Sequence, residues 1–356
     1  MTFKDMRIQI KARVIRLFLG ALDSDESRFF LNSIDNHHGG VRSSVPYSDD
    51  PYTEKNSSAE LKVAGPIFIT GRFRSGSTLL WNIFRQLKGY TAYYEPFNER
   101  RWFDSSHRGS HTDTTHRGVS DYWAEYDGLG DLEKYYREDW VRYRLYMDEE
   151  SFDFGMKSYV NALIERASGR AVLQFNRADF RLGWLRDNYP RAKIVHIYRN
   201  PRDQWCSVLG DHQDYSSGAT SSDGFHDRFY LRMWCRDLCR QFPFLADYYN
   251  HHQYFLFYFL WKLSYCFGRH YADISIAMED LTSNPKTITQ SILDCVGAPN
   301  SVLEKASDLA FVKPTSSRWQ EYASDRWFRV IEEECDSIVI DFLKGGQRHE
   351  PDSAVQ

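Results

Sequence analysis

The sequence predicts an α/β protein with a P-loop-type, doubly wound parallel sheet of about four to five strands flanked by helices. Three observations predict this fold. The apolar run Ile67–Ile69 has the length and composition of a buried parallel strand. After a glycine-containing turn, apolar residues recur at helical spacing at Leu79, Leu80, Ile83, Phe84 and Leu87. From residue 157 onward, apolar runs alternate with helix-like segments, and parallel strands require such crossovers.

The other elements follow in order along the chain. Further strands are predicted at 91–96, where Pro96 stops the run, and at 171–175, 194–198 and 274–278. Helical spacing predicts helices over 132–146, 159–164, 180–185, 202–209, 228–246, 253–269, 285–296 and 324–343. Polar segments at about 100–135 and 211–227 are predicted to be loop insertions.

The composition along the chain predicts one organised domain over 65–345. Residues 1–64 are expected to form an N-terminal helix and a surface extension, and 346–356 a tail. Basic and apolar residues interleave over 1–20, which predicts an amphipathic helix that packs on the protein itself or contacts a membrane surface or a partner. Charges recur there too often for a signal peptide or a membrane span, so we expect a cytoplasmic protein.

Charge and cysteine usage narrow the function classes. The formal net charge of −4 and the pI near 6.3 provide no global field for nucleic acid, so an anionic ligand must meet a local cluster of cations. The six cysteines include no CxxC pair and are expected to be reduced. A metal site is an open alternative at two places: Cys235 and Cys239, four apart on a predicted helix, and His107, His111 and His116 in a loop. Buried core thiols and solvated loop histidines are the commoner explanation of such residues.

The turn after the first strand has the glycine spacing of a phosphate-binding loop. Gly71 and Gly76 match the GxxxxGK[ST] pattern, in which backbone N–H groups and a helix N-terminus surround an anion. Ser77 occupies the position of the lysine that normally reaches the β- and γ-phosphates of a nucleoside triphosphate. The loop cations lie earlier instead, at Arg72 and Arg74. The pattern therefore favours an anion other than a magnesium-bound triphosphate.

The donors of this turn suit a phosphate that also carries a transferring group. Arg74 offers a planar fork of donors that stays charged. Ser75 and Gly76 belong to the turn, and Ser77 and Thr78 add hydroxyl and backbone donors at the first turn of the helix.

A second anion site is predicted after the strand at 194–198. That strand ends in Arg199, Asn200-Pro201 turns the chain, and the next helix brings in Ser207. Ligands of doubly wound sheets bind at this edge, so Arg199 and Ser207 can close on one phosphate.

Glu95 is the predicted catalytic base, because it follows an apolar strand and precedes a proline, which places it at the same sheet edge. A surface carboxylate at a turn is the competing explanation. Glu99 is the second choice. His196 is predicted to be a core histidine, because its neighbours along the strand are Val195 and Ile197.

These motifs together resemble those of the sulfotransferase superfamily. The loop Arg74–Thr78 after one strand, and Arg199 with Ser207 after another, are similar to that family's 5′-phosphosulfate and 3′-phosphate motifs. The resemblance implies transfer of a sulfuryl group from 3′-phosphoadenosine 5′-phosphosulfate to an acceptor hydroxyl, releasing adenosine 3′,5′-bisphosphate, with no metal required. It also implies that Arg318, with Trp319 beside it, lies in the segment that closes over the cofactor.

Within that superfamily, Arg74 in place of lysine and the run Tyr94-Glu95-Pro96 are closest to the carbohydrate sulfotransferases. A glycan or glycolipid acceptor and a bacterial-type cytoplasmic member are therefore expected. The cytosolic branch of the family implies a histidine base, which has no match here because the strand 171–175 leads into Asn176-Arg177.

Two other functions remain open from the sequence. Glu279-Asp280 after an apolar strand can imitate a magnesium-binding strand end, which suits a P-loop kinase or nucleotide hydrolase. A nucleotide-binding module without turnover is the other.

Overall fold

The computed structural model describes residues 65–116, 118–210, 215–299, 303–310 and 318–345. Apart from Glu150–Phe152, these residues belong to one compact unit. The helix and extension predicted for 1–64 and the tail predicted for 346–356 lie outside the described residues.

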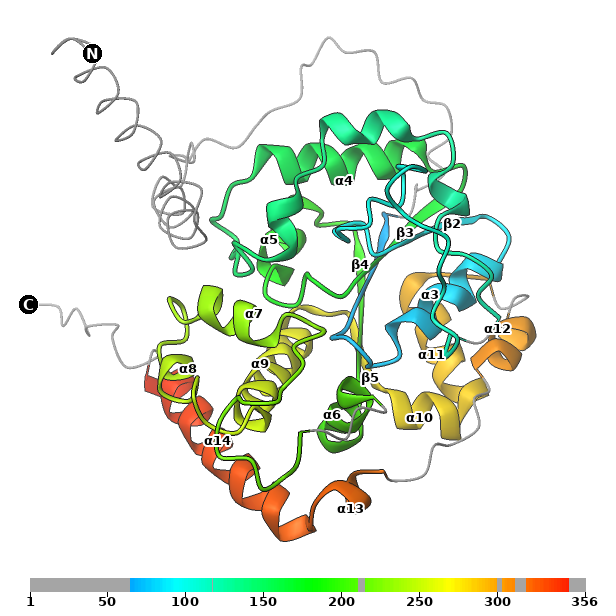
Figure 1. Cartoon of the computed structure of the whole chain (residues 1–356). Coiled ribbons are helices and arrows are strands. Elements are labelled where there is room, and N and C mark those ends of the chain that lie inside the picture. Colours follow the sequence, from blue (N-terminus) through cyan, green and yellow to red (C-terminus); the bar gives the residue numbers. More distant parts are fainter. Residues whose placement is uncertain (1–64, 117, 211–214, 300–302, 311–317, 346–356) are drawn as a thin grey trace, which may run out of the picture. The chain divides into compact units, whose positions relative to one another are not determined.

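A five-stranded, all-parallel sheet in the order β2-β3-β1-β4-β5 forms the centre of this unit (Figure 1). Its strands are β1 (Ile67–Thr70), β2 (Tyr90–Tyr94), β3 (Arg170–Phe175), β4 (Lys193–Tyr198) and β5 (Ile274–Ala277). β1 is central and fully buried, as expected for a parallel strand covered on both faces. The predicted fold class and all five predicted strands are confirmed.

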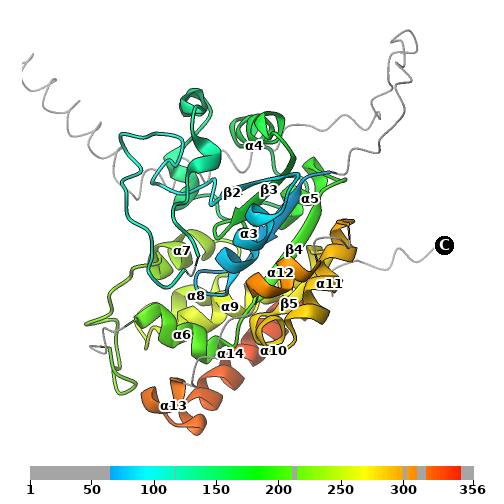
Figure 2. The same ribbon diagram turned by 90° about the vertical axis from the view of Figure 1, so that its right-hand side faces the viewer.

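Helices cover both faces of the sheet. In the described residues they are α3 (Ser77–Gln86), α4 (Phe154–Arg166), α5 (Leu182–Asn188), α6 (Pro201–Leu209), α7 (Leu231–Leu238), α8 (Phe244–Asp247), α9 (Tyr254–Tyr271), α10 (Met278–Ser283), α11 (Pro285–Val296), α12 (Leu303–Ala310), α13 (Trp319–Tyr322) and α14 (Asp325–Gly345). α3, α11 and α12 lie on one face, and α5 and α9 lie on the other, with α14 packed outside α9 (Figures 1 and 2). None of the described helices is long and apolar enough to cross a membrane.

Two helix predictions are wrong. Residues 132–146 contain no α-helix; they contain part of one 3₁₀ helix, Gly130–Lys134, and a second, Glu138–Val141, because Trp140 and Val141 bury individually rather than along a helical stripe. The helix predicted over 228–246 is interrupted between α7 and α8, where Pro243 cannot continue the hydrogen-bond ladder. The helices α10, α12 and α13 were not predicted.

Two apolar clusters adjoin the loop that follows β1. The first surrounds β1 and contains Trp81 of α3 and Trp184 of α5. The second lies between α6, α7, α9 and α14 and contains Trp205 and Phe73, which belongs to the loop itself. Because Phe73 contacts the rings of Phe229 and Trp234, the loop is fastened to the second cluster as well as to the sheet.

Candidate active site

The candidate site lies along the carboxyl edge of the sheet, where neighbouring strands deliver their last residues. In spatial order these are Glu95 after β2, Asn176 after β3, the loop after β1, Arg199 after β4 and Glu279 after β5. The chain leaves β1 toward β2 and later returns to β4 on the other side of β1. The junction of β1 and β4 is therefore the topological switch point at which sheets of this class bind ligands.

The loop after β1, residues 71–76, has an irregular backbone that only particular residues allow. Arg74 and Gly76 both have left-handed φ angles, of 67° and 98°. A Cβ on Gly71 would lie 2.5 Å from the Ile197 carbonyl oxygen, so the glycine lets β4 and the loop approach closely. A Cβ on Gly76 would lie 2.4 Å from Sδ of Met278.

The donors of this loop fit an anion. The Ser75 hydroxyl is buried and has no hydrogen-bond partner among the described residues. Helix α3 begins with the buried Ser77 and Thr78, has no side-chain cap at its N-terminus and has no acidic residue in its first turn. An uncapped first turn leaves backbone N–H groups and the positive end of the helix dipole for an outside acceptor. We call residues 71–78 the cradle.

Arg74 extends from the cradle to two other parts of the chain. Its Nε donates to the Ser207 hydroxyl of α6 over 2.9 Å. Its Nη1 pairs with Asp113 Oδ2 at 3.1 Å, and its Nη2 donates to Thr115 Oγ1 at 3.2 Å, both in the 100–135 loop. A cradle residue and a residue of the second predicted motif are thus in direct contact.

Arg72 is placed differently. Its guanidinium is buried, lies 3.5 Å from Asp179 Oδ2 and faces the ring of Trp234. Burial lowers the pKa of Arg72, and the Asp179 charge acts in the opposite direction. Of the two loop cations, Arg72 is therefore committed to an internal pair, whereas Arg74 is one-fifth exposed, at 21%.

Three predicted phosphate residues gather around α6. Ser207 lies on that helix, and Arg318 donates to the carbonyl oxygen of Gly210 at its end, over 3.2 Å. Burial lowers the pKa of Arg199, and the Arg74 charge lowers it further. Burial raises the pKa of Cys206 to about 11, while Arg318 and Arg199 both act to lower it. Arg199 lies just before the start of α6 and Arg318 contacts its end, so both cations lie beside this helix.

Glu95 is buried, with a left-handed φ of 38°, a strained conformation of the kind that recurs in functional sites. Its Oε1 accepts a hydrogen bond from Asn176 Nδ2. Its Oε2 accepts from Asn98 Nδ2 at 2.5 Å and from Arg177 Nη1 at 2.6 Å. Asn176 Oδ1 in turn accepts from the Ser77 hydroxyl at 2.8 Å. One amide side chain therefore connects the predicted base to the cradle.

Arg177 supplies the positive charge of this network. Besides Glu95 it pairs with Glu99, whose second oxygen accepts from Tyr230 OH at 2.5 Å. Burial lowers the pKa of Arg177, but the charges of Glu95 and Glu99 outweigh it and the pKa is raised. Burial raises the pKa of Glu99, but Arg177 and Tyr230 outweigh it and the pKa is lowered.

His196 and Glu279 are engaged in structural contacts. His196 is buried, its Nδ1 lies 2.7 Å from Ser275 Oγ, and burial lowers its pKa to about 4. Glu279 Oε1 accepts from the backbone N–H of Asn200 at 2.9 Å. In the described residues no group of three His, Cys, Asp or Glu side chains is placed to hold a metal ion. The six cysteines are free thiols.

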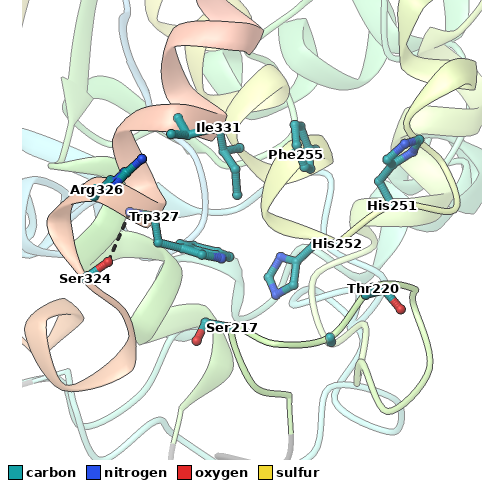
Figure 3. Close-up of a pocket in the computed structure, with 11 residues that line it drawn as sticks. Ser217, Thr220, His251, His252, Phe255, Ser324, Arg326, Trp327 and Ile331 are labelled. Atoms are coloured by element: carbon teal, nitrogen blue, oxygen red, sulfur yellow. Dashed lines mark hydrogen bonds between the residues drawn. The ribbon is translucent and has the colours of Figure 1, made fainter.

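The 211–227 loop borders a separate pocket of about 600 Å³, distinct from the cradle. Ser217, Ala219 and Thr220 form one wall, and the start of α14, including Trp327 and Ile331, forms the opposite wall (Figure 3). His252 lies between the two walls in this view and also contacts Trp205 of α6. Residues two apart on a helix point to different sides, so Trp205 faces this pocket's wall while Ser207 faces Arg74. The pocket shares no residue with the cradle.

Sequence reasoning missed several polar residues of the site. They are Gln174, Asn176, Arg177 and Asp179 on β3 and directly after it, and Asp113 in the loop. Gln174 Nε2 donates both to Ser77 Oγ, at 3.1 Å, and to Asn176 Oδ1, at 2.7 Å. The position at a predicted strand end was a usable signal for the residues after β3. Nothing in the sequence marked Asp113.

Removing the cation of this network is expected to be strongly destabilising, because Arg177 is buried with Glu95 and also pairs with the partly buried Glu99. Arg177→Met leaves two carboxylates without their cation and should lower the free energy of unfolding by roughly 3–5 kcal/mol, measured by urea denaturation. The matched control is Arg137→Met, because the Arg137–Asp139 pair is half-exposed and should contribute less than about 1 kcal/mol. Equal losses in the two variants would contradict this interpretation of the network.

Comparison with known proteins identifies the family. A model of the sulfotransferase family matches residues 66–259, more than half of the chain, and this range includes the cradle, Glu95, Arg199 and Ser207. The solved structure of the sulfotransferase STF9 from Mycobacterium avium is 13% identical, covers 80% of this chain and 77% of its own, and superposes with a TM-score of 0.41. No curated protein matches the chain. The chain therefore belongs to the sulfotransferase family and is a transferase of sulfuryl groups.

Proposed function

We propose that this protein transfers a sulfuryl group from 3′-phosphoadenosine 5′-phosphosulfate to an acceptor hydroxyl. The observation that carries the proposal is the contact between Arg74 and Ser207, because it joins the loop after β1 to the helix after β4. Two anion-binding motifs that meet in this way suit a ligand with two separate phosphate groups better than a linear triphosphate.

Each group of residues has a distinct place in this proposal. Ser75, Ser77 and Thr78, with the backbone N–H groups of the cradle, would hold the 5′-phosphosulfate. Arg199, Ser207 and Arg318 would hold the 3′-phosphate, with Arg72 supporting the loop through its buried pair with Asp179. When bound, the cofactor supplies the sulfuryl group and a phosphate leaving group. In this proposal arginines, hydroxyl groups and backbone N–H groups bind the phosphates, and no step is assigned to a metal ion.

Arg74 and Glu95 are the proposed catalytic residues. Arg74 stabilises negative charge that develops on the leaving phosphate, since its guanidinium is planar and permanently charged. Glu95 accepts the proton of the acceptor hydroxyl, and its hydrogen bonds to Asn176, Asn98 and Arg177 fix the carboxylate relative to the cradle. The reaction needs the hydroxyl, the sulfuryl group and the leaving oxygen in line, which the shared sheet edge favours.

A glycan or glycolipid is the proposed acceptor. The support is the run Tyr94-Glu95-Pro96 and the arginine at position 74, which resemble those of carbohydrate sulfotransferases. The 100–135 loop reaches the cradle through Asp113 and brings aromatic residues beside it, among them Tyr122 stacked on Tyr94 with centroids 4.4 Å apart. This loop would therefore lie beside an acceptor held at the cradle.

Thermal denaturation tests the proposed cofactor. Adenosine 3′,5′-bisphosphate without magnesium should raise the melting temperature, because the cradle and the α6 residues bind it only in the folded state. If ATP with magnesium raised the melting temperature and the bisphosphate did not, the proposal would be overturned in favour of a P-loop kinase or nucleotide hydrolase. Screening labelled sulfate transfer over sugars, glycolipids and phenols would identify the acceptor.

Arg199→Ala should weaken the bisphosphate selectively. Loss of charge-assisted hydrogen bonds to the 3′-phosphate is expected to reduce affinity by roughly 10- to 100-fold. Affinity for adenosine 5′-phosphate, which lacks that group, should change little when both ligands are titrated by calorimetry. Equal losses for the two ligands would mean that Arg199 does not hold the 3′-phosphate.

Glu95→Gln should reduce kcat by about 10²–10⁴ while leaving bisphosphate affinity unchanged, because the amide cannot accept the proton. Glu99→Gln is the matched control, since it also removes one carboxylate partner of Arg177. If Glu99→Gln lost turnover and Glu95→Gln kept it, the two residues would exchange roles. Turnover unchanged in both variants would remove each of them as the base.

A further inference from the structure

We propose that Asp113 is the resident counter-ion of Arg74, which the anionic cofactor replaces when it binds, so that Asp113 sets the affinity of the cradle for its ligand. This inference rests on the proposed function, in which Arg74 faces the phosphosulfate. It assigns a role to a loop residue outside both phosphate-binding motifs.

Each of the three nitrogens of the Arg74 guanidinium makes one hydrogen bond in the structure, so three of its five N–H groups are engaged. Nε donates to Ser207, Nη1 to Asp113 and Nη2 to Thr115. The contact to Asp113 is the only one of the three to an anion. The carboxylate therefore takes the position relative to Arg74 that an oxygen of a bound phosphate or sulfonate would need.

The carboxylate of Asp113 is held ready for this contact. Its Oδ1 accepts from the backbone N–H of Thr115 at 2.8 Å and from the Thr115 hydroxyl at 2.7 Å. This leaves Oδ2 directed to Arg74. Burial raises the pKa of Asp113, but the Thr115 hydrogen bonds and the nearby His116 and Arg74 outweigh it and the pKa is lowered. The side chain is thus a fixed negative charge at neutral pH.

A second connection links the same turn to the cradle. The backbone N–H of Asp113 donates to Tyr122 OH at 2.9 Å, and the Tyr122 ring stacks on Tyr94. The Tyr94 hydroxyl lies 3.2 Å from Thr78 Oγ1, in the first turn of α3. These contacts run from Asp113 through Tyr122 and Tyr94 to Thr78. An anion that contacts both Arg74 and Thr78 would therefore lie against both ends of this series of contacts.

Exposure distinguishes this pair from the other ion pairs of the site. The side chains of Arg74 and Asp113 are 21% and 41% exposed, whereas those of Arg177 and Glu95 are 3% and 6% exposed. A partly exposed pair is weak, because water screens it. A phosphate with several oxygens and more charge can displace it, whereas the buried pair of Arg177 and Glu95 is not exchangeable in this way.

The test is the affinity of Asp113→Asn for adenosine 3′,5′-bisphosphate, measured by titration calorimetry at low salt. Asparagine keeps the local turn but removes the competing charge, so binding should become roughly three- to tenfold tighter. The control is Asp104→Asn. Asp104 lies in the same loop and its carboxylate accepts hydrogen bonds from Ser106, so its removal changes the net charge equally without touching Arg74. The affinity of this control should stay within about twofold of the wild type.

Each outcome decides the inference. Unchanged or weaker binding by Asp113→Asn overturns it, the weaker case indicating that Asp113 positions Arg74 for the ligand instead. An equal gain in Asp104→Asn also overturns it, since the effect would then be general charge. If the bisphosphate binds neither wild type nor variant, the proposed cofactor is wrong, and pyrophosphate becomes the probe. Tighter pyrophosphate binding by Asp113→Asn then supports the counter-ion role, and equal or absent binding overturns it.

Discussion

A parallel sheet directs the carboxyl end of every strand to one edge, and the site of this protein depends on that constraint. The order β2-β3-β1-β4-β5 puts the cradle between the residues that follow β3 and those that follow β4. Glu95 therefore approaches the cradle from one side through Asn176, and Arg199 from the other side near Ser207. Because every connection crosses over through a helix or a long loop, these groups meet although more than a hundred residues separate the first from the last.

Burial then decides which charges at that edge are fixed. Two carboxylates beside the cradle, the buried Glu95 and the partly buried Glu99, are tolerated because Arg177 pairs with both. The amides of Asn98 and Asn176 donate to the oxygens of Glu95 as well. Desolvation makes such a network costly to build and more costly to break, so it specifies one arrangement rather than adding much net stability. A rigid carboxylate beside the cradle suits the role of proton acceptor that we propose for Glu95.

Exposure leaves the remaining charge exchangeable. Arg72 is buried with Asp179, but Arg74 and Asp113 meet where water still reaches both. The same residue type, two positions apart in one loop, therefore takes two roles: one arginine holds the loop and the other is available to a ligand. The protein has a net charge of −4 and the proposed ligand is a polyanion, so the affinity of the proposed site would depend on a few local cations such as Arg74.

The sequence by itself determined the parallel α/β fold, the cradle and the second motif at Arg199 and Ser207, because apolar runs, glycine spacing and strand ends are local patterns. It placed Glu95 at the correct edge for the same reason. It failed over 132–146, where individual aromatic side chains bury without a helical stripe. Only the tertiary structure decided the partners of those residues, such as Asn176 between Glu95 and Ser77 and Asp113 against Arg74, since contacts between distant segments depend on strand order and loop path, which no local pattern records.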